Sequence, residues 1–266
     1  MNADFALLPP VREIIERVKE VSGKDVIFRP APDQLVPATS KIARARMASH
    51  VIKYQPQMIQ RINHLTAHEC GHILRTMAAD PSIRIVPMSN AGTKAIAKRR
   101  LGKELSHLPE GLREQMLDIW LGGIITQITS LPACVRIERW IQRDYPALKD
   151  EQRIFLDEDV KRTVQGLSKK IERLTPKTIF RISNSITYAY LRGLEPVTGK
   201  DLRRRFSDWP SIIRTGIQLY EALGDEDGGY AGDIRVTNDW AKILGVSDWF
   251  GWIGFEDVPE SYFKDV

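Results

Sequence analysis

The chain has 266 residues, of which 42% are hydrophobic and 27% charged, and a formal net charge of +5. This composition is ordinary for a globular protein of one large domain or two small ones. Two cysteines are too few for a disulfide framework and suit a reducing compartment. The sequence has no run of about eighteen apolar residues and no export signal at its start. We therefore expect a cytoplasmic protein without a membrane span.

The first part of the chain predicts one helix and two strands. Apolar residues recur at helical spacing over residues 10–21, and Gly23 would end this helix. Residues 25–29 predict a short strand before Pro30, and residues 49–54 predict a second strand. A small sheet is therefore expected ahead of the next helix.

That next helix contains the one stretch whose residue types and spacing specify chemistry, His64-Leu-Thr-Ala-His68-Glu69-Cys-Gly-His72. Residues four apart project from one helix face, so His68 and His72 can bind one metal ion together. Zn²⁺ favours neutral imidazoles, and a catalytic zinc site keeps one position for water. Glu69 would take the proton of that water as it attacks a peptide carbonyl. Apolar residues surround the motif at helical spacing, which predicts a buried helix.

A zinc site needs a third protein ligand, and helix geometry excludes the nearest histidine. His64 lies eight residues before His72, a rise of about 12 Å, whereas zinc–nitrogen bonds are about 2 Å long. Asp80 sits where the helix should end, just before Pro81. We therefore expect the third ligand on a later element.

The favoured third ligand lies in a long apolar helix that Pro109 should begin. Glu114 and Asp118 are four residues apart and would share a face of this helix. Glu114 would bind zinc, and Asp118 would accept the ring N–H of a ligating histidine and fix its tautomer. Glu110, one turn earlier, is the competitor. The alternative is that these are solvated carboxylates near a helix start, where the helix dipole favours them.

The motifs at residues 68–72 and 114–118, His-Glu-x-x-His and Glu-x-x-x-Asp, resemble those of the gluzincin metallopeptidases. More narrowly, residues 66–74 are similar to the ImmA/IrrE group, which has a downstream Glu-x-x-Ala-Asn/Asp-x-Phe signature. This chain departs from that signature with Leu117 for the Ala and Trp120 for the Phe, and its interval between the motifs is long. The resemblance covers roughly residues 10–135.

The resemblance implies a zincin-like core, zinc as the metal, and a cytoplasmic endopeptidase that cuts a protein partner. In this group the partner is typically a helix-turn-helix transcriptional repressor, cleaved under control of a stress or phage signal. Residues 49–54 would then be the edge strand on which an extended substrate aligns. His50 and Tyr54 would line the cleft, unless they are simply the alternating faces of a strand.

The second half of the chain predicts helices and carries little chemistry. All five histidines lie within the first 107 residues. We expect an α+β, predominantly helical fold with a zincin-like metallopeptidase domain at residues 1–148 and a helical substrate-binding or regulatory region at 149–266. The helices expected in that region span residues 151–174, 176–194 and 210–223, followed by a turn at 224–233 and by aromatic residues that should pack in a core.

Basic residues cluster in runs at 94–103, 161–162, 169–170 and 203–205. The first run belongs to a predicted helix with Thr93 as its N-cap, which would act as a lid or a spacer. Such runs can contact phosphates or an acidic partner, although most are solvated faces. The alternative function is therefore a nucleic-acid-responsive regulatory or binding protein with a zinc site. It would be proteolytically inactive or activated only by DNA or RNA.

The interpretation we favour is a zinc-dependent endopeptidase. His68, His72 and Glu114 would hold Zn²⁺, Glu69 would be the catalytic base, and Asp118 would orient a histidine. The residues left open as proton donors are His107, Tyr145, Tyr188 and Tyr190. The substrate and the oligomeric state have no signature in the sequence.

Overall fold

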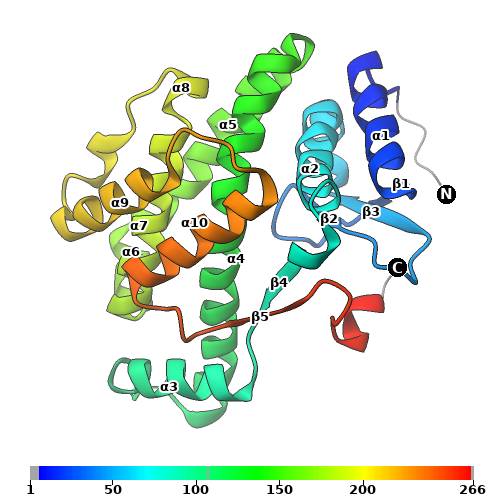
Figure 1. The fold of residues 1–266 in the computed structure, drawn as a ribbon. Coiled ribbons are helices and arrows are strands. Elements are labelled where there is room, and N and C mark those ends of the chain that lie inside the picture. Colours follow the sequence, from blue (N-terminus) through cyan, green and yellow to red (C-terminus); the bar gives the residue numbers. More distant parts are fainter. Residues whose placement is uncertain (1–5, 107, 265–266) are drawn as a thin grey trace. The chain divides into compact units, whose positions relative to one another are not determined.

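The computed structural model describes residues 6–106 and 108–264, so His107 lies outside the described residues. The fold is α+β and predominantly helical, as expected (Figure 1). The α-helices of the described chain are α1 (Pro9–Ser22), α2 (Ile62–Met77), α3 (Ala91–Leu105), α4 (Glu110–Asp144), α5 (Lys149–Val164), α6 (Lys169–Leu174), α7 (Lys177–Gly193), α8 (Glu195–Thr198), α9 (Pro210–Leu223) and α10 (Gly229–Leu244). Its strands are β1 (Asp25–Pro30), β2 (Ala38–Lys41), β3 (Ser49–Tyr54), β4 (Ile85–Met88) and β5 (Gly251–Gly254).

The chain divides into two compact units that are discontinuous in sequence. The first comprises Met1–Ile85, Arg136–Leu156 and Gly254–Val266, and the second comprises Val86–Val135 and Asp157–Ile253. This organisation differs from the expected division at residue 148, because the C-terminal segment and the end of α4 belong with the N-terminal elements.

The first unit contains a three-stranded sheet in the order β1-β3-β2. Strand β1 runs parallel to β3, and β2 runs antiparallel to it. The expectation that residues 49–54 form the edge strand is wrong, because β3 is the central strand. Its Val51 and Ile52 are both fully buried. Since successive strand residues point to opposite faces, β3 is covered on both sides. The sequence analysis missed β2, whose four residues show no hydrophobic alternation.

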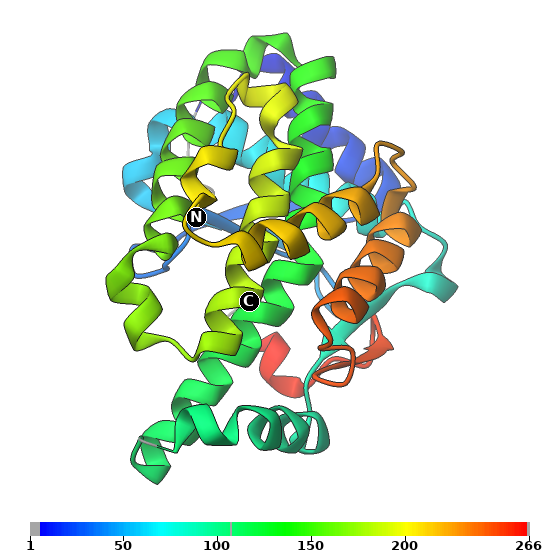
Figure 2. The same ribbon diagram turned by 90° about the vertical axis from the view of Figure 1, so that its left-hand side faces the viewer.

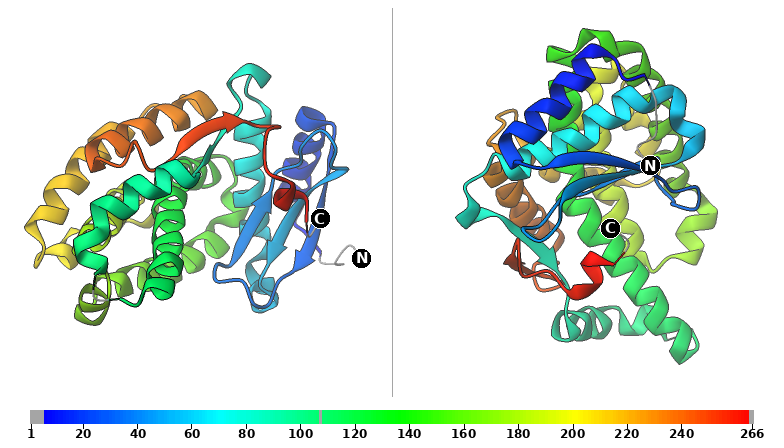
Figure 3. Two further views of the ribbon diagram at one scale, coloured as in Figure 1. Left: turned by 90° about the horizontal axis from the view of Figure 1, so that it is seen from below. Right: turned by 90° about the vertical axis from the view of Figure 1, so that its right-hand side faces the viewer.

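Helices α1 and α2 cover one face of this sheet (Figure 3). The buried stripe of α1 consists of Val11, Ile14 and Val18, and the helix ends at Gly23, whose φ of 68° is in the left-handed region. The expected buried motif helix is confirmed as α2, which buries apolar residues on both sides of the motif, including Leu65 and Ile73. The motif therefore stands on a helix fixed by packing.

Helix α4 stays regular although Pro132 lies in its interior. Proline cannot donate a hydrogen bond to the carbonyl one turn earlier. The hydroxyl of Thr237 donates to that carbonyl of Ile128 instead, at 3.2 Å. By length and composition α4 is also the one described helix that is apolar enough to cross a membrane. Core helices of soluble proteins meet the same criterion, so the fold remains compatible with a soluble protein.

The second unit is mainly helical, and its α9 packs against both α7 and α10 (Figure 2). The indole of Trp240 on α10 is fully buried and donates to the Leu219 carbonyl of α9 at 2.8 Å. Trp249, Phe250 and Phe255 are also buried, which confirms the expected core packing for these residues. Trp252 is half-buried and donates to the side chain of Asn238 at 3.0 Å. Part of the turn expected at 224–233 is helical, because α10 begins at Gly229.

Buried His50 on β3 should make the stability of the protein depend on pH. Its Nδ1 accepts the Ala43 N–H, and its Nε2 lies 2.9 Å from the Ser22 hydroxyl. Burial, together with the nearby cations of Lys24 and Arg44, lowers the pKa of His50 from 6.5 to about 4. Below pH 6.5 the His50 imidazole is protonated in the unfolded chain, whereas in the folded protein it stays neutral down to about pH 4. Stability is therefore lost as the pH falls through this window.

Between pH 7 and pH 5 we expect His50 to remove about 2 kcal/mol of unfolding free energy. Urea denaturation at both pH values would measure it. The control is His50→Asn, whose amide oxygen can replace Nδ1 as the acceptor without titrating. Equal losses in the two proteins would contradict the assignment.

Candidate metal centre

The start of α2 is held by a carboxylate from α5. Glu151 accepts the backbone N–H of His64 at 3.0 Å and the side-chain amide of Asn63 at 2.9 Å. No α2 side chain caps this helix start, so Glu151 bonds amide groups that would otherwise lack partners. Its negative charge also complements the positive end of the helix dipole. These contacts fix α2 one turn before the predicted metal ligands.

The structure brings His68 and His72 together on α2, with ring centroids 5.1 Å apart. Both rings are half-buried. Burial, together with the nearby His68 and Arg75, lowers the pKa of His72 to about 3. His72 is therefore neutral at physiological pH, which is the form that binds a metal ion.

A carboxylate that the sequence analysis did not select lies against these histidines. Glu138 on α4 is fully buried. Its Oε1 is 2.7 Å from Nδ1 of His68, and its Oε2 is 3.0 Å from Nε2 of His64. Gln152 of α5 donates to both the side chain and the backbone carbonyl of Glu138, at 2.7 and 2.8 Å. One buried carboxylate thus accepts hydrogen bonds from three side chains.

The hydrogen-bonding histidines keep the Glu138 carboxylate ionised. Burial by itself raises the pKa of this carboxyl, but His64 and His68 oppose burial strongly enough to bring the pKa below its ordinary value. Glu138 is therefore an ionised acceptor, and His68 donates its Nδ1 proton to it. A histidine held in this tautomer binds a metal through Nε2. Glu138 occupies the orienting position that the sequence analysis gave to Asp118.

His64 belongs to the site as a partner of Glu138. Its fully buried ring packs against Phe155, with ring centroids 4.8 Å apart. Because its Nε2 donates to the carboxylate, its Nδ1 carries a lone pair, and this atom has no hydrogen-bond partner among the described residues. The conclusion that His64 and His72 do not share an ion rests on helix rise and still holds. The role of His64 in holding the Glu138 carboxylate is not apparent from the sequence.

Glu69, the expected catalytic base, contacts the edge strand of the sheet. Its side chain is 8% exposed. The hydroxyl and the backbone N–H of Ser40 on β2 both hydrogen-bond to its carboxylate. Burial raises the pKa of Glu69, while His68 and the bonds from Ser40 oppose this increase. A base with a raised pKa has greater proton affinity, which suits proton abstraction near neutral pH.

The structure corrects the expectation that Glu114 is the metal ligand and Asp118 the orienting acid. Both side chains are more than half exposed, and they pair with Lys98 and Lys94 of α3. Glu114 also lies twenty-four residues before Glu138 on the same helix, a distance of about 36 Å along the axis. The two acids are the solvated pair near a helix start that the sequence analysis kept as the alternative.

Within the described residues of the first unit, His64, His68 and Glu138 form a group that could hold a metal ion. Their potential ligand atoms all lie within 4.8 Å of one another. The orientation of His68 by Glu138 is therefore central to the site. Nothing in the local sequence around Glu138 distinguishes it from the other acids of the same helix.

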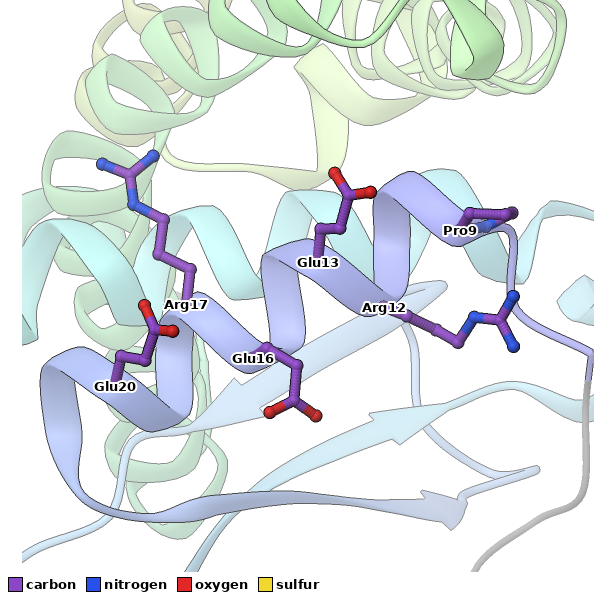
Figure 4. Close-up of a pocket in the computed structure, with 6 residues that line it drawn as sticks. All are labelled: Pro9, Arg12, Glu13, Glu16, Arg17 and Glu20. Atoms are coloured by element: carbon purple, nitrogen blue, oxygen red, sulfur yellow. The ribbon is translucent and has the colours of Figure 1, made fainter.

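A separate shallow pocket lies on the outer face of α1 (Figure 4). Both acidic and basic side chains line it, and none of the predicted site residues contributes to it. The residues that line it are Pro9, Arg12, Glu13, Glu16, Arg17 and Glu20.

Comparisons of this chain with protein-family models, with curated proteins and with solved structures find no match. The site is therefore interpreted from its own geometry.

Exchange of Glu138 for glutamine should weaken zinc binding by about 10- to 100-fold, the usual effect of removing the hydrogen-bond partner of a metal ligand. The matched variant Glu114→Gln changes an exposed carboxylate on the same helix and should leave zinc affinity unchanged. Competition with a chromogenic chelator measures both affinities, and circular dichroism checks that both variants fold. A loss of affinity in Glu114→Gln alone would restore Glu114 as the ligand.

Gly71, inside the motif, allows α4 to approach α2. A methyl group at this position would lie 2.8 Å from Cγ2 of Ile137, which is buried next to Glu138 in the sequence. We expect Gly71→Ala to destabilise the protein by about 1–3 kcal/mol through overpacking. It should also weaken zinc binding by displacing Glu138.

The control for this substitution is Gly102→Ala on α3, where an added methyl group meets nothing within 4 Å. Because alanine is the better helix former, this change should stabilise the protein by up to about 1 kcal/mol. Denaturant unfolding and chelator competition measure the two effects. Unchanged zinc affinity in Gly71→Ala would show that Glu138 does not depend on this close packing.

Proposed function

We propose that the protein is a zinc-dependent endopeptidase. The observation that carries the proposal is the 2.7 Å contact between the buried Glu138 carboxylate and Nδ1 of His68. A carboxylate behind a histidine is the usual support for a zinc ligand, because it fixes the tautomer and increases the basicity of the ring. Peptide hydrolysis at such a site also requires a general base, and Glu69, next to His68 in the sequence, would be that base.

The donor types suit zinc better than a hard cation. His68 and His72 supply imidazole nitrogens, which zinc prefers, whereas calcium and magnesium prefer oxygen ligands. Both rings are half-buried, and His72 is neutral at physiological pH. The two histidines would therefore hold the ion, with Glu138 behind His68.

When bound, zinc supplies Lewis-acid polarisation of the scissile carbonyl and of the attacking water. The carboxylate of Glu69 accepts the proton of that water and then passes it to the departing amine nitrogen. Ser40 holds this carboxylate through its hydroxyl and its backbone N–H, so the base is oriented before substrate binds. Glu138 keeps the His68 ring in one tautomer throughout.

The substrate class that fits this site is an extended protein segment. Strand β2 lies at the edge of its sheet, and Ser40 of β2 contacts the catalytic base. An edge strand pairs with an extended chain through main-chain hydrogen bonds, without reading its sequence. As part of the proposal, we infer that a small DNA-binding repressor in the cytoplasm is the partner cleaved, on the resemblance of residues 66–74 to the ImmA/IrrE group.

The basic runs give less support to nucleic-acid binding than the sequence suggests. Several of their cations are paired with acids, which reduces the charge left for phosphates. These pairs are Lys94–Asp118, Lys98–Glu114, Lys169–Glu172 and Arg203–Asp201. The nucleic-acid-responsive alternative therefore stays a prediction, and no contact described for residues 6–106 and 108–264 favours it over the endopeptidase.

The test of the function is Glu69→Gln, which removes the base but no metal ligand. This variant should retain one zinc per chain and lose hydrolysis of an unfolded test protein or a co-expressed repressor by at least about 100-fold. The control is Glu13→Gln on the exposed face of α1, which should retain activity. Metal analysis and electrophoresis of the cleavage products measure the two properties. Full activity in Glu69→Gln, or no zinc in the wild-type protein, would overturn the proposal.

A further inference from the structure

We infer that the enzyme pairs with the main chain of its substrate on one side of the cleaved bond only, and that Leu35 and Val36 select the substrate on that side. This inference rests on the proposed function and deepens it, because it names the substrate class of the same site. It starts from the direction in which the main-chain groups of β2 point. All the residues that carry it belong to the first unit.

The hydrogen bonds of β2 show which of its residues point away from β3. In an antiparallel pair, residues that bond to the partner strand alternate with residues whose N–H and C=O groups point outward. The N–H of Gln55 donates to the carbonyl of Pro37 at 2.9 Å, and this pair directly precedes the β2–β3 register. Residues 37, 39 and 41 therefore bond to β3, whereas Ala38 and Ser40 point outward. The bond from the Ser40 N–H to Glu69 agrees with this assignment.

The outward groups of β2 place the substrate relative to the catalytic base. The Ser40 N–H bonds to Glu69, while the Ser40 carbonyl and the main-chain groups of Ala38 point to the side on which an added strand pairs. A substrate strand on β2 therefore brings one of its peptide bonds beside Ser40, the residue that contacts the base. From there the substrate could run toward either end of β2.

The C-terminal segment at residues 254–264 closes one of these ends. The next residue of the outward series, Ile42, accepts the Tyr262 hydroxyl at its carbonyl, at 2.9 Å. The guanidinium of Arg44 lies over the rings of Phe255 and Tyr262, 3.4 and 4.5 Å from their centroids, and Arg44 is only 4% exposed. A cation held over aromatic faces away from water is a strong contact. A substrate strand therefore cannot continue its pairing as far as Ile42.

The other end of β2 leads to two exposed apolar side chains. Leu35 and Val36 lie in the loop before β2 and are 94% and 45% exposed. This loop is fixed by two side-chain amides. That of Gln34 donates to the Lys53 carbonyl at 3.3 Å, and that of Gln55 donates to the Gln34 carbonyl at 2.6 Å. The two apolar side chains therefore project from an anchored loop, directly along the path of a paired substrate.

These features define the substrate class. A strand rises about 3.3 Å per residue, so a chain paired from Ser40 past Ala38 reaches Val36 about four residues from the cleaved bond. An apolar side chain at this position covers Leu35 and Val36 and removes their apolar surface from water. The enzyme thus selects extended segments with an apolar residue on one side of the cleaved bond. It makes little demand on the other side.

Peptides of different lengths test the inference. The zinc-loaded full-length protein is incubated with an unfolded test protein, and mass spectrometry identifies the bond that it cleaves best. Synthetic peptides that contain this bond are then shortened from either end. Shortening from five residues to two should raise KM at least about 10-fold on one side of the bond and less than about 2-fold on the other.

A double variant tests the two apolar residues. Leu35→Asn combined with Val36→Thr makes both side chains polar with little change of shape. It should raise KM for the long peptide at least about 5-fold at unchanged kcat, because it removes binding that is equal in the ground state and the transition state. It should not change KM for a peptide already shortened on the sensitive side, because the contact is absent there.

The control is Val21→Thr, which changes a valine of similar exposure on α1 and should leave both KM values unchanged. Two results would overturn the inference and have different meanings. Equal dependence on length at both sides of the bond, or an unchanged KM in the double variant, would exclude one-sided recognition and leave the endopeptidase proposal intact. No cleavage of the unfolded test protein by the zinc-loaded wild-type protein would overturn both.

Discussion

The site depends on a pair of hydrogen bonds that the buried carboxylate of Glu138 accepts from the imidazole rings of His64 and His68. An isolated ionised acid in a protein interior is very unfavourable, because it loses its hydration. Glu138 is stable there because His64, His68 and Gln152 all donate to it. These hydrogen bonds require α2, α4 and α5 to pack closely together. Gly71 permits this because it has no side chain to contact Ile137 of α4. Packing and electrostatics therefore favour the same arrangement.

The sequence predicts the buried helix of the histidine motif well because its signal is local. The spacing of His68 and His72, and the apolar residues around them, need nothing beyond helix periodicity. The position of the third ligand depends on tertiary structure, because residue spacing on one helix does not show which part of another helix packs beside it. Glu114 and Asp118 have the right types and spacing, but their lysine partners on α3 hold them in solvent.

Glu138 escaped selection for a similar reason. It stands in the sequence Arg136-Ile-Glu-Arg139, which has the composition of a solvated helix face. Its burial results from partners on other elements. The same applies to the sheet, where β3 looks like an edge strand until the four residues of β2 pair with it. The basic run at 94–103 is equally uninformative alone, because the acidic partners of Lys94 and Lys98 lie on the next helix.

The network around Glu138 has a consequence for how the protein would acquire its metal. Gln152 and His64 position the carboxylate through contacts within the protein, so His68 is held ready by the fold. In small zinc-folded domains, by contrast, the ion supplies the folding energy. Here the ion would bind to a site that is already folded, and it would be exchangeable. Its identity would depend on the supply of competing metals in the cell as well as on intrinsic affinity, which generally favours copper over zinc.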